Sequence, residues 1–215
     1  MVKRDGSAWG TGCNENGQLG DGTYVDRTAF VQVIPGDVVA VSAGGAHSIV
    51  IMEDGSVWAT GWNKHGQLGD GSTTERTNYV RVISMGAKAV AAGKRHSIIL
   101  KQDGSLWCTG YNRYGQLGTG DNNDVWSFVE VSFSDATAIA AGSFHSMTLK
   151  EDGSMWATGS NRYGQLGDGT ITSKRKFTLV EPFLGEIASA TVQGMEQTLS
   201  SSCCDSRAGT IVAVF

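Results

Sequence analysis

Residues 103–118 read Asp-Gly-Ser-Leu-Trp-Cys-Thr-Gly-Tyr-Asn-Arg-Tyr-Gly-Gln-Leu-Gly, and close copies of this stretch occur elsewhere in the chain. The Asp-Gly-Ser part begins at Asp5, Asp54, Asp103 and Asp152, which is a constant step of 49 residues. Gly-Gln-Leu-Gly follows the same step, beginning at Gly17, Gly66, Gly115 and Gly164. A fixed period of this size indicates a repeat architecture, so residues 1–182 are predicted to hold four similar units.

Each unit is predicted to contain four short strands, A to D. In the best-preserved copy these are 87–93, 96–101, 105–109 and 126–132. Asp103-Gly104 between B and C favours a hairpin with a type I′ turn. Strand A carries the small residues Ala91-Ala92-Gly93, which suit a strand close to a central axis. The predicted fold is all-β: a β-propeller of four 49-residue, four-stranded antiparallel blades.

The motifs together resemble the regulator of chromosome condensation repeat family. In one copy they comprise Val90 to Gly93, His96-Ser97, Asp103 to Ser105, Trp107, Thr109-Gly110, Asn112 and Gly115 to Gly118. The resemblance covers residues 1 to about 182 and implies a β-propeller, usually of seven blades. Family members include an exchange factor for the small GTPase Ran, a plant UV-B photoreceptor, ubiquitin-ligase modules and a bacterial β-lactamase inhibitor. The resemblance therefore implies a fold without selecting one function.

The number of units differs from that of the seven-bladed relatives. Residues 183–215 are predicted to be a degenerate fifth partial repeat or C-terminal tail, in which Gly194 to Thr198 corresponds to Gly142 to Ser146 and Gln197 replaces the histidine. We expect an open arc or partial propeller rather than a compact four-bladed ring. An open arc leaves unpaired apolar blade faces, so self-association through open blade edges is an expected property.

Composition narrows the class of partner. The net charge of −4 does not favour nucleic acid, which calls for a basic surplus. No stretch approaches the roughly 18 apolar residues of a membrane span, and the first residues lack a secretory apolar region. A cytoplasmic or nuclear location is therefore favoured over secretion. Cys13, Cys108, Cys203 and Cys204 show no zinc-binding spacing, and neither a metal nor a cofactor is predicted.

The repeated His-Ser pairs are the most suggestive candidates for catalysis. They are His47-Ser48, His96-Ser97 and His145-Ser146. Adjacent residues in a strand point to opposite faces, so neither member can activate the other, and packing is the predicted role. The glycine-rich loop from Gly61 to Gly66 lacks the Lys and Ser/Thr of a phosphate-binding loop. The chain is therefore not predicted to be an enzyme.

Candidate binding residues lie where the copies differ, because the constant positions are needed for folding. In an up-and-down blade, the A-to-B turns and the C-to-D loops share one end, and the Asp-Gly turns lie at the other. The variable residues at the first end combine cations with aromatic rings. Arginine and aromatic residues are enriched at protein interfaces. They are Trp62, Lys64, His65, Lys94, Arg95, Tyr111, Arg113, Tyr114, Phe144, Arg162 and Tyr163.

The predicted function is a non-catalytic protein-interaction scaffold that binds an acidic protein partner at this end. Glu53, Asp54, Asp103, Glu151 and Asp152 make the opposite end acidic. Two alternatives stay open: a guanine-nucleotide exchange factor for a Ran-like small GTPase, and a proteinaceous enzyme inhibitor. The residues do not identify the partner.

Overall fold

The computed structural model describes residues 1–180, and every regular element within them is a β-strand. Three sheets have four antiparallel strands each, and the first sheet has two. The first sheet pairs β1 (Ala8–Gly12) with β2 (Arg27–Ile34). The second contains β3 (Val38–Ala43), β4 (His47–Met52), β5 (Val57–Gly61) and β6 (Arg76–Ile83). The third contains β7 (Ala87–Ala92), β8 (His96–Lys101), β9 (Leu106–Gly110) and β10 (Val125–Val131). The fourth contains β11 (Ala136–Ala141), β12 (His145–Lys150), β13 (Met155–Gly159) and β14 (Lys174–Leu179).

The four-stranded blade predicted from the sequence is confirmed for three of the four units. Strands A to D correspond to β7 to β10 in the copy used for the prediction, with bounds that agree to within one residue. The first unit is different, because β1 and β2 are its strands C and D, and an isolated bridge between Val2 and Ala8 replaces strand B. The predicted partial repeat at 183–215 lies outside the described residues.

The Asp-Gly hairpins form, but their turn type differs from the prediction. In the β4–β5 hairpin, Gly55 has φ of 75°, whereas Asp54 is not among the residues with positive φ. The Met52 N–H donates to Ser56 O at 2.9 Å, and the Gly55 N–H donates to Met52 O at 2.8 Å. These bonds define a three-residue loop that ends in a left-handed glycine, not a two-residue type I′ turn. The glycine is needed because its conformation is costly for other residues.

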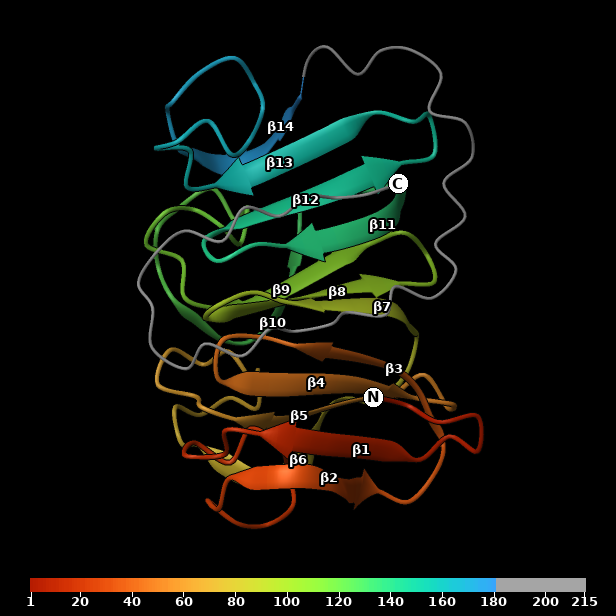
Figure 1. Ribbon diagram of the computed structural model, residues 1–215. Coiled ribbons are helices and arrows are strands. Elements are labelled where there is room, and N and C mark those ends of the chain that lie inside the picture. Colours follow the sequence, from red (N-terminus) through yellow and green to blue (C-terminus); the bar gives the residue numbers. More distant parts are fainter. Residues whose placement is uncertain (181–215) are drawn as a thin grey trace.

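The sheets stack in sequence order into an open arc (Figure 1). The first sheet lies at one end of the stack and the β11–β14 sheet lies at the other, so the described residues do not close a ring. β3 contacts β7 and β7 contacts β11, which places these first strands of each sheet side by side. Their alanine content allows this close approach, as the sequence predicted.

Hydrophobic clusters between consecutive sheets hold the arc together. One cluster joins Ile49, Ile51 and Leu68 of the second unit to Ile99 and Phe128 of the third. An equivalent cluster joins Ile98, Leu117 and Cys108 to Phe177 of the fourth unit. The leucines of three Gly-Gln-Leu-Gly loops, Leu68, Leu117 and Leu166, are buried and anchor those loops. Cys108 is buried, and burial raises the pKa of its thiol.

Candidate protein-interaction surface

Backbone hydrogen bonds bring the A-to-B turn and the C-to-D loop of each blade together. The Trp62 N–H donates to Ala46 O at 2.8 Å, and the Tyr111 N–H donates to Arg95 O at 2.9 Å. The corresponding bond in the fourth sheet runs from the Ser160 N–H to Phe144 O at 2.8 Å. The two kinds of connection therefore share one end of the arc, which we call the loop-end surface. It consists of residues 43–47, 61–75, 92–96, 110–124, 141–145 and 159–173.

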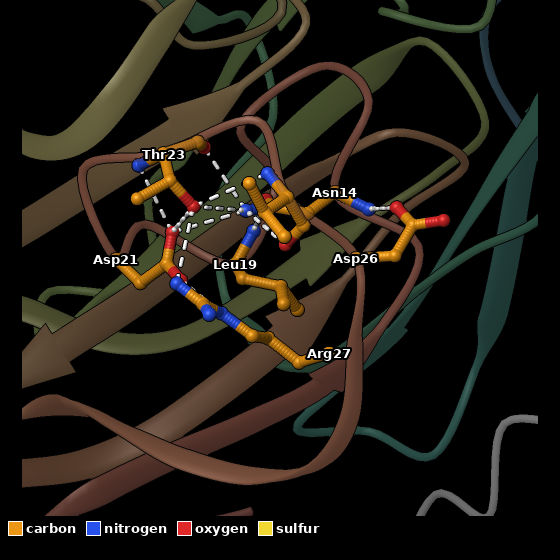
Figure 2. A network of polar contacts seen from close by, with 7 residues as sticks. Asn14, Leu19, Asp21, Thr23, Asp26 and Arg27 are labelled. Atoms are coloured by element: carbon orange, nitrogen blue, oxygen red, sulfur yellow. Dashed lines mark hydrogen bonds and ion pairs between the residues drawn. The ribbon is translucent and has the colours of Figure 1, made fainter.

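A buried asparagine organises each C-to-D loop. Figure 2 shows the first of these loops, in which the Asn14 Nδ2 donates to Asp21 Oδ1, Thr23 O and Val25 O. The Asn14 Oδ1 accepts the Leu19 N–H at 2.9 Å, which fixes the leucine that fills the loop. Asn63, Asn112 and Asn161 make the same bond to Leu68, Leu117 and Leu166. These asparagines are thus part of the loop framework and are not available to a partner.

Three of the four loops also contain an internal ion pair. Arg27 contacts Asp21 at 2.6 Å, Arg76 contacts Asp70 at 2.7 Å, and Lys174 contacts Asp168 at 3.1 Å. Burial alone would raise the pKa of Asp70, but the hydrogen bonds from Ser72 and Arg76 outweigh it and lower the pKa. In the third loop, Thr119 and Val125 occupy the two positions of this pair. These ion pairs were not predicted from the sequence. They could have been, because the acidic and the basic residue are present together in three loops and are both replaced in the third.

Five aromatic rings form a continuous chain across three blades. Trp62 and His65 lie 5.5 Å apart between ring centroids, and His65 lies 4.7 Å from Tyr111. Tyr111 in turn lies 6.1 Å from Phe144, and Tyr114 lies 5.4 Å from Phe144. The pairs are edge-on, an arrangement that aromatic rings favour. Residues from the loops of two blades and the turn of a third therefore become one surface feature.

Two cations lie over this chain of rings. The Arg95 guanidinium is 5.1 Å from the Trp62 centroid and 5.8 Å from that of Tyr111. The Lys94 Nζ is 5.8 Å from the Phe144 centroid. Cation–π contacts of this length orient a charged group without neutralising it. We refer to Trp62, His65, Lys94, Arg95, Tyr111, Tyr114 and Phe144 as the aromatic–cation cluster.

Four of the eleven sequence-predicted residues lie outside this cluster. Lys64 and Arg113 are exposed at the loop tips. Arg162 and Tyr163 are exposed in the last loop, where the guanidinium lies 5.8 Å from the Tyr163 ring. An unpredicted residue joins the site instead, since Asp124 Oδ2 lies 2.8 Å from the His65 Nδ1. The carboxylate also accepts the Asn112 N–H, which ties it to the loop framework.

The repeated histidines and serines interact between blades and not within their own strand. The His47 Nε2 lies 2.9 Å from Ser97 Oγ, and the His96 Nε2 lies 3.0 Å from Ser146 Oγ. The hydroxyl of Ser97 donates to Gln67 O, and that of Ser146 donates to Gln116 O. Each histidine must therefore donate its Nε2 proton to the serine, so it cannot act as the base. Burial lowers the pKa of His47 to about 4, consistent with a neutral packed ring.

The described part of the chain holds no group of three or more His, Cys, Asp or Glu side chains placed to bind a metal ion. A search of residues 1–180 for a helix of the length and hydropathy needed to cross a bilayer found none.

Comparisons with known proteins agree on one repeat. The family model of the regulator of chromosome condensation (RCC1) repeat matches residues 5–51, 54–100 and 103–149. A second model of the same repeat matches residues 38–67, 87–116 and 136–165. The comparison with curated proteins finds no match.

Solved structures share the fold at low sequence identity. Yeast RCC1 (Prp20) bound to Kap60 is 20% identical with a TM-score of 0.76, covering 84% of this chain and 46% of that one. Prp20p from Saccharomyces cerevisiae is 20% identical with a TM-score of 0.75, and the match covers 84% of this chain and 48% of that one. Human WBSCR16 is 24% identical with a TM-score of 0.71, and the match covers 82% of this chain and 48% of that one. The chain thus spans about half the length of these proteins.

Proposed function

Because the chain belongs to the regulator of chromosome condensation repeat family, we propose that it is a non-catalytic protein-interaction scaffold. The proposed binding site is the loop-end surface, centred on the aromatic–cation cluster. The proposed ligand is an acidic segment of a protein partner. The family match itself establishes the propeller repeats.

The observation that carries the proposal is an imbalance of free charge at the loop-end surface. Within residues 1–180, none of its cations Lys64, Lys94, Arg95, Arg113 and Arg162 forms an ion pair. Of its carboxylates, Asp70 and Asp168 are paired inside their loops and Asp124 contacts His65, whereas the exposed Glu75 and Asp121 form no ion pair within the described residues. The five unpaired cations therefore outnumber the two unpaired carboxylates at this surface, although the whole chain carries −4. A negatively charged partner is the complementary ligand.

Arg95 is well suited to be the central contact. Its guanidinium is oriented by the Trp62 and Tyr111 rings, and it donates no hydrogen bond to any residue of the described chain. A guanidinium offers paired N–H groups that match a carboxylate, and an oriented one loses less entropy on binding. Arg95 therefore has both the free donors and the fixed position that carboxylate recognition requires.

The relatives supply context of the same kind. The yeast structures concern a complex with Kap60 and binding to Gsp1p and histones, which are protein partners of those proteins. This supports protein binding as the role of the fold, while the identities below 25% leave the partner of this chain open.

The test is charge reversal on the loop-end surface. Lys94→Glu, Arg95→Glu and Arg113→Glu together should reduce capture of the partner by at least about tenfold, because attraction becomes repulsion. Capture from a native lysate followed by mass spectrometry identifies the partner, and titration with the purified partner measures its affinity. Raising the salt concentration should weaken wild-type binding, since exposed charges are screened.

The matched control reverses three cations at the opposite end. Arg4, Arg81 and Lys88 are exposed and lie near the Asp-Gly turns. Changing all three to Glu gives the control the same net charge as the loop-end variant. This control should retain the partner. Equal capture by the loop-end variant and the wild type would refute the proposed site.

The two alternative functions are separated by activity assays. An exchange factor would accelerate the release of labelled nucleotide from a Ran-like GTPase, and an inhibitor would suppress the turnover of one enzyme at near-stoichiometric amounts. Neither effect is expected from a scaffold. The exchange-factor alternative draws on family membership, and no residue of the described chain specifically favours it.

A further inference from the structure

Consecutive units are joined by a contact that recurs three times in this chain. An aromatic side chain of the last strand of one blade packs on the final glycine of the preceding Gly-Gln-Leu-Gly motif. The pairs are Tyr79 on Gly20, Phe128 on Gly69, and Phe177 on Gly118. A Cβ at Gly118 would lie 2.7 Å from the Phe177 ring, so any side chain there would block the aromatic knob. Phe128 and Phe177 are buried by this contact.

A buried hydrogen bond accompanies each of these contacts. The Thr60 Oγ1 donates to Gly17 O at 3.0 Å, Thr109 to Gly66 O at 2.9 Å, and Thr158 to Gly115 O at 2.8 Å. All three threonines are fully buried. Each junction between units therefore combines an aromatic knob and a threonine donor on one side with two loop glycines on the other.

The two ends of the arc present the separate halves of this junction. At the β1–β2 end, Phe30 and Thr11 occupy the positions of the knob and the donor. Both are exposed, Phe30 to 54%, unlike their counterparts in the other units. At the β11–β14 end, Gly167 and Gly164 occupy the positions of the receiving glycines. A Cβ at Gly164 would have no neighbour within 4 Å among the described residues.

We propose that a second copy of this chain covers each end, so that the β11–β14 sheet of one copy receives the β1–β2 sheet of the other. Phe30 of one copy packs on Gly167 of the second, and the Thr11 hydroxyl donates to Gly164 O of the second. The interface repeats the three internal junctions, with the same partners in the same register. It is independent of the partner-binding function proposed above.

The matching halves of the junction favour a second copy as the occupant, because every copy carries the knob and the donor at one end and the receiving glycines at the other. Two copies supply about eight units, which lies within the range of closed propellers. The halves of the junction lie at opposite ends of the stack, so they do not meet within the described chain (Figure 1). A head-to-tail contact that closes after two copies gives a ring with two identical junctions.

The first experiment measures the molar mass of the full chain in solution by light scattering and sedimentation. We expect twice the 22.7 kDa of one chain across the micromolar range. Phe30→Asp removes the knob, and Gly167→Asn blocks the receiving site while tolerating its positive φ. Each should raise the dissociation constant by about 100-fold or more. Met85→Asp, which adds a charge at another exposed apolar residue, should leave the dimer intact.

A mixing experiment tests the head-to-tail arrangement. A chain with Phe30→Asp retains its glycine end, and a chain with Gly167→Asn retains its phenylalanine end. Equal amounts of the two variants should therefore form a dimer through one intact junction, although neither forms it alone. A junction that pairs like ends would not be restored by mixing.

Circular dichroism establishes first that both variants keep the wild-type spectrum and a cooperative thermal transition. A wild-type chain that stays monomeric throughout the micromolar range would overturn the proposal. So would a dimer that survives Phe30→Asp and Gly167→Asn unchanged, or one that Met85→Asp disrupts equally.

Discussion

At the scale of single residues, buried histidines link neighbouring blades. His96 is fully buried between two sheets, with its Nε2 3.0 Å from Ser146 Oγ and its Nδ1 without a partner in the described chain. Burial lowers the pKa of His96 to about 3, aided by the nearby His47 and His145. The neutral ring fits this site because a second proton would be buried on Nδ1 without an acceptor.

The histidines give the protein a defined sensitivity to acid. Their pKa is lower in the folded chain than the ordinary 6.5, so the unfolded chain binds more protons below about pH 6.5. The stabilisation is therefore complete above that pH and is lost as the pH falls toward 4. We expect the free energy of unfolding to decrease by about 1 kcal/mol per pH unit for each histidine.

Urea unfolding at several pH values between 7 and 4 measures this slope. His96→Gln keeps a donor of similar size without a titrating ring, so its slope should be shallower than that of the wild type. Identical slopes in the two proteins would contradict the assignment of the acid sensitivity to this residue.

At the scale of elements, the C-to-D loops differ chiefly in their internal ion pair. The Asp70–Arg76 pair of the second loop is replaced by Thr119 and Val125 in the third, while the asparagine framework is kept. A partly exposed ion pair contributes modestly to stability. The pair is therefore an addition to the loop framework and not the feature that forms it.

Transplanting the pair tests this interpretation. In a double-mutant cycle, Thr119→Asp and Val125→Arg should show a favourable coupling of about 1 kcal/mol or less, measured by chemical unfolding. The reverse cycle, Asp70→Thr with Arg76→Val, serves as the control and should give coupling of the same sign. Additive effects in both cycles would indicate that the charges do not interact.

The strands were predictable from the sequence because the 49-residue register repeats every local signal. The bounds of β7 to β10 follow from the glycine turns and the apolar runs between them. The turn type was wrong because the type I′ assignment required positive φ at both Asp103 and Gly104, whereas only Gly104 has it in the three-residue loop 102–104. The Asp–Arg pairs were missed because their members stand six positions apart in a polar loop.

At the scale of the whole molecule, the arrangement of the sheets decides which loops meet. The alternation of strand direction predicted that the eleven candidate residues share one end of the blades. It could not predict that His65 lies against Tyr111 while Lys64 is exposed outside the cluster, because such contacts depend on the rotation between successive sheets. The open arc was predicted from the number of units. That its two ends carry complementary halves of the junction between units could be recognised only from the structure.

The central claim is that the partner binds at the loop-end surface, and hydrogen–deuterium exchange on the captured complex tests it most directly. We predict that binding slows amide exchange at residues 62–65, 94–95, 111–114 and 143–144. Exchange at the Asp-Gly turns, residues 53–55, 102–104 and 151–153, should stay as in the free protein. Protection confined to those turns, with unchanged exchange in the loops, would contradict the account.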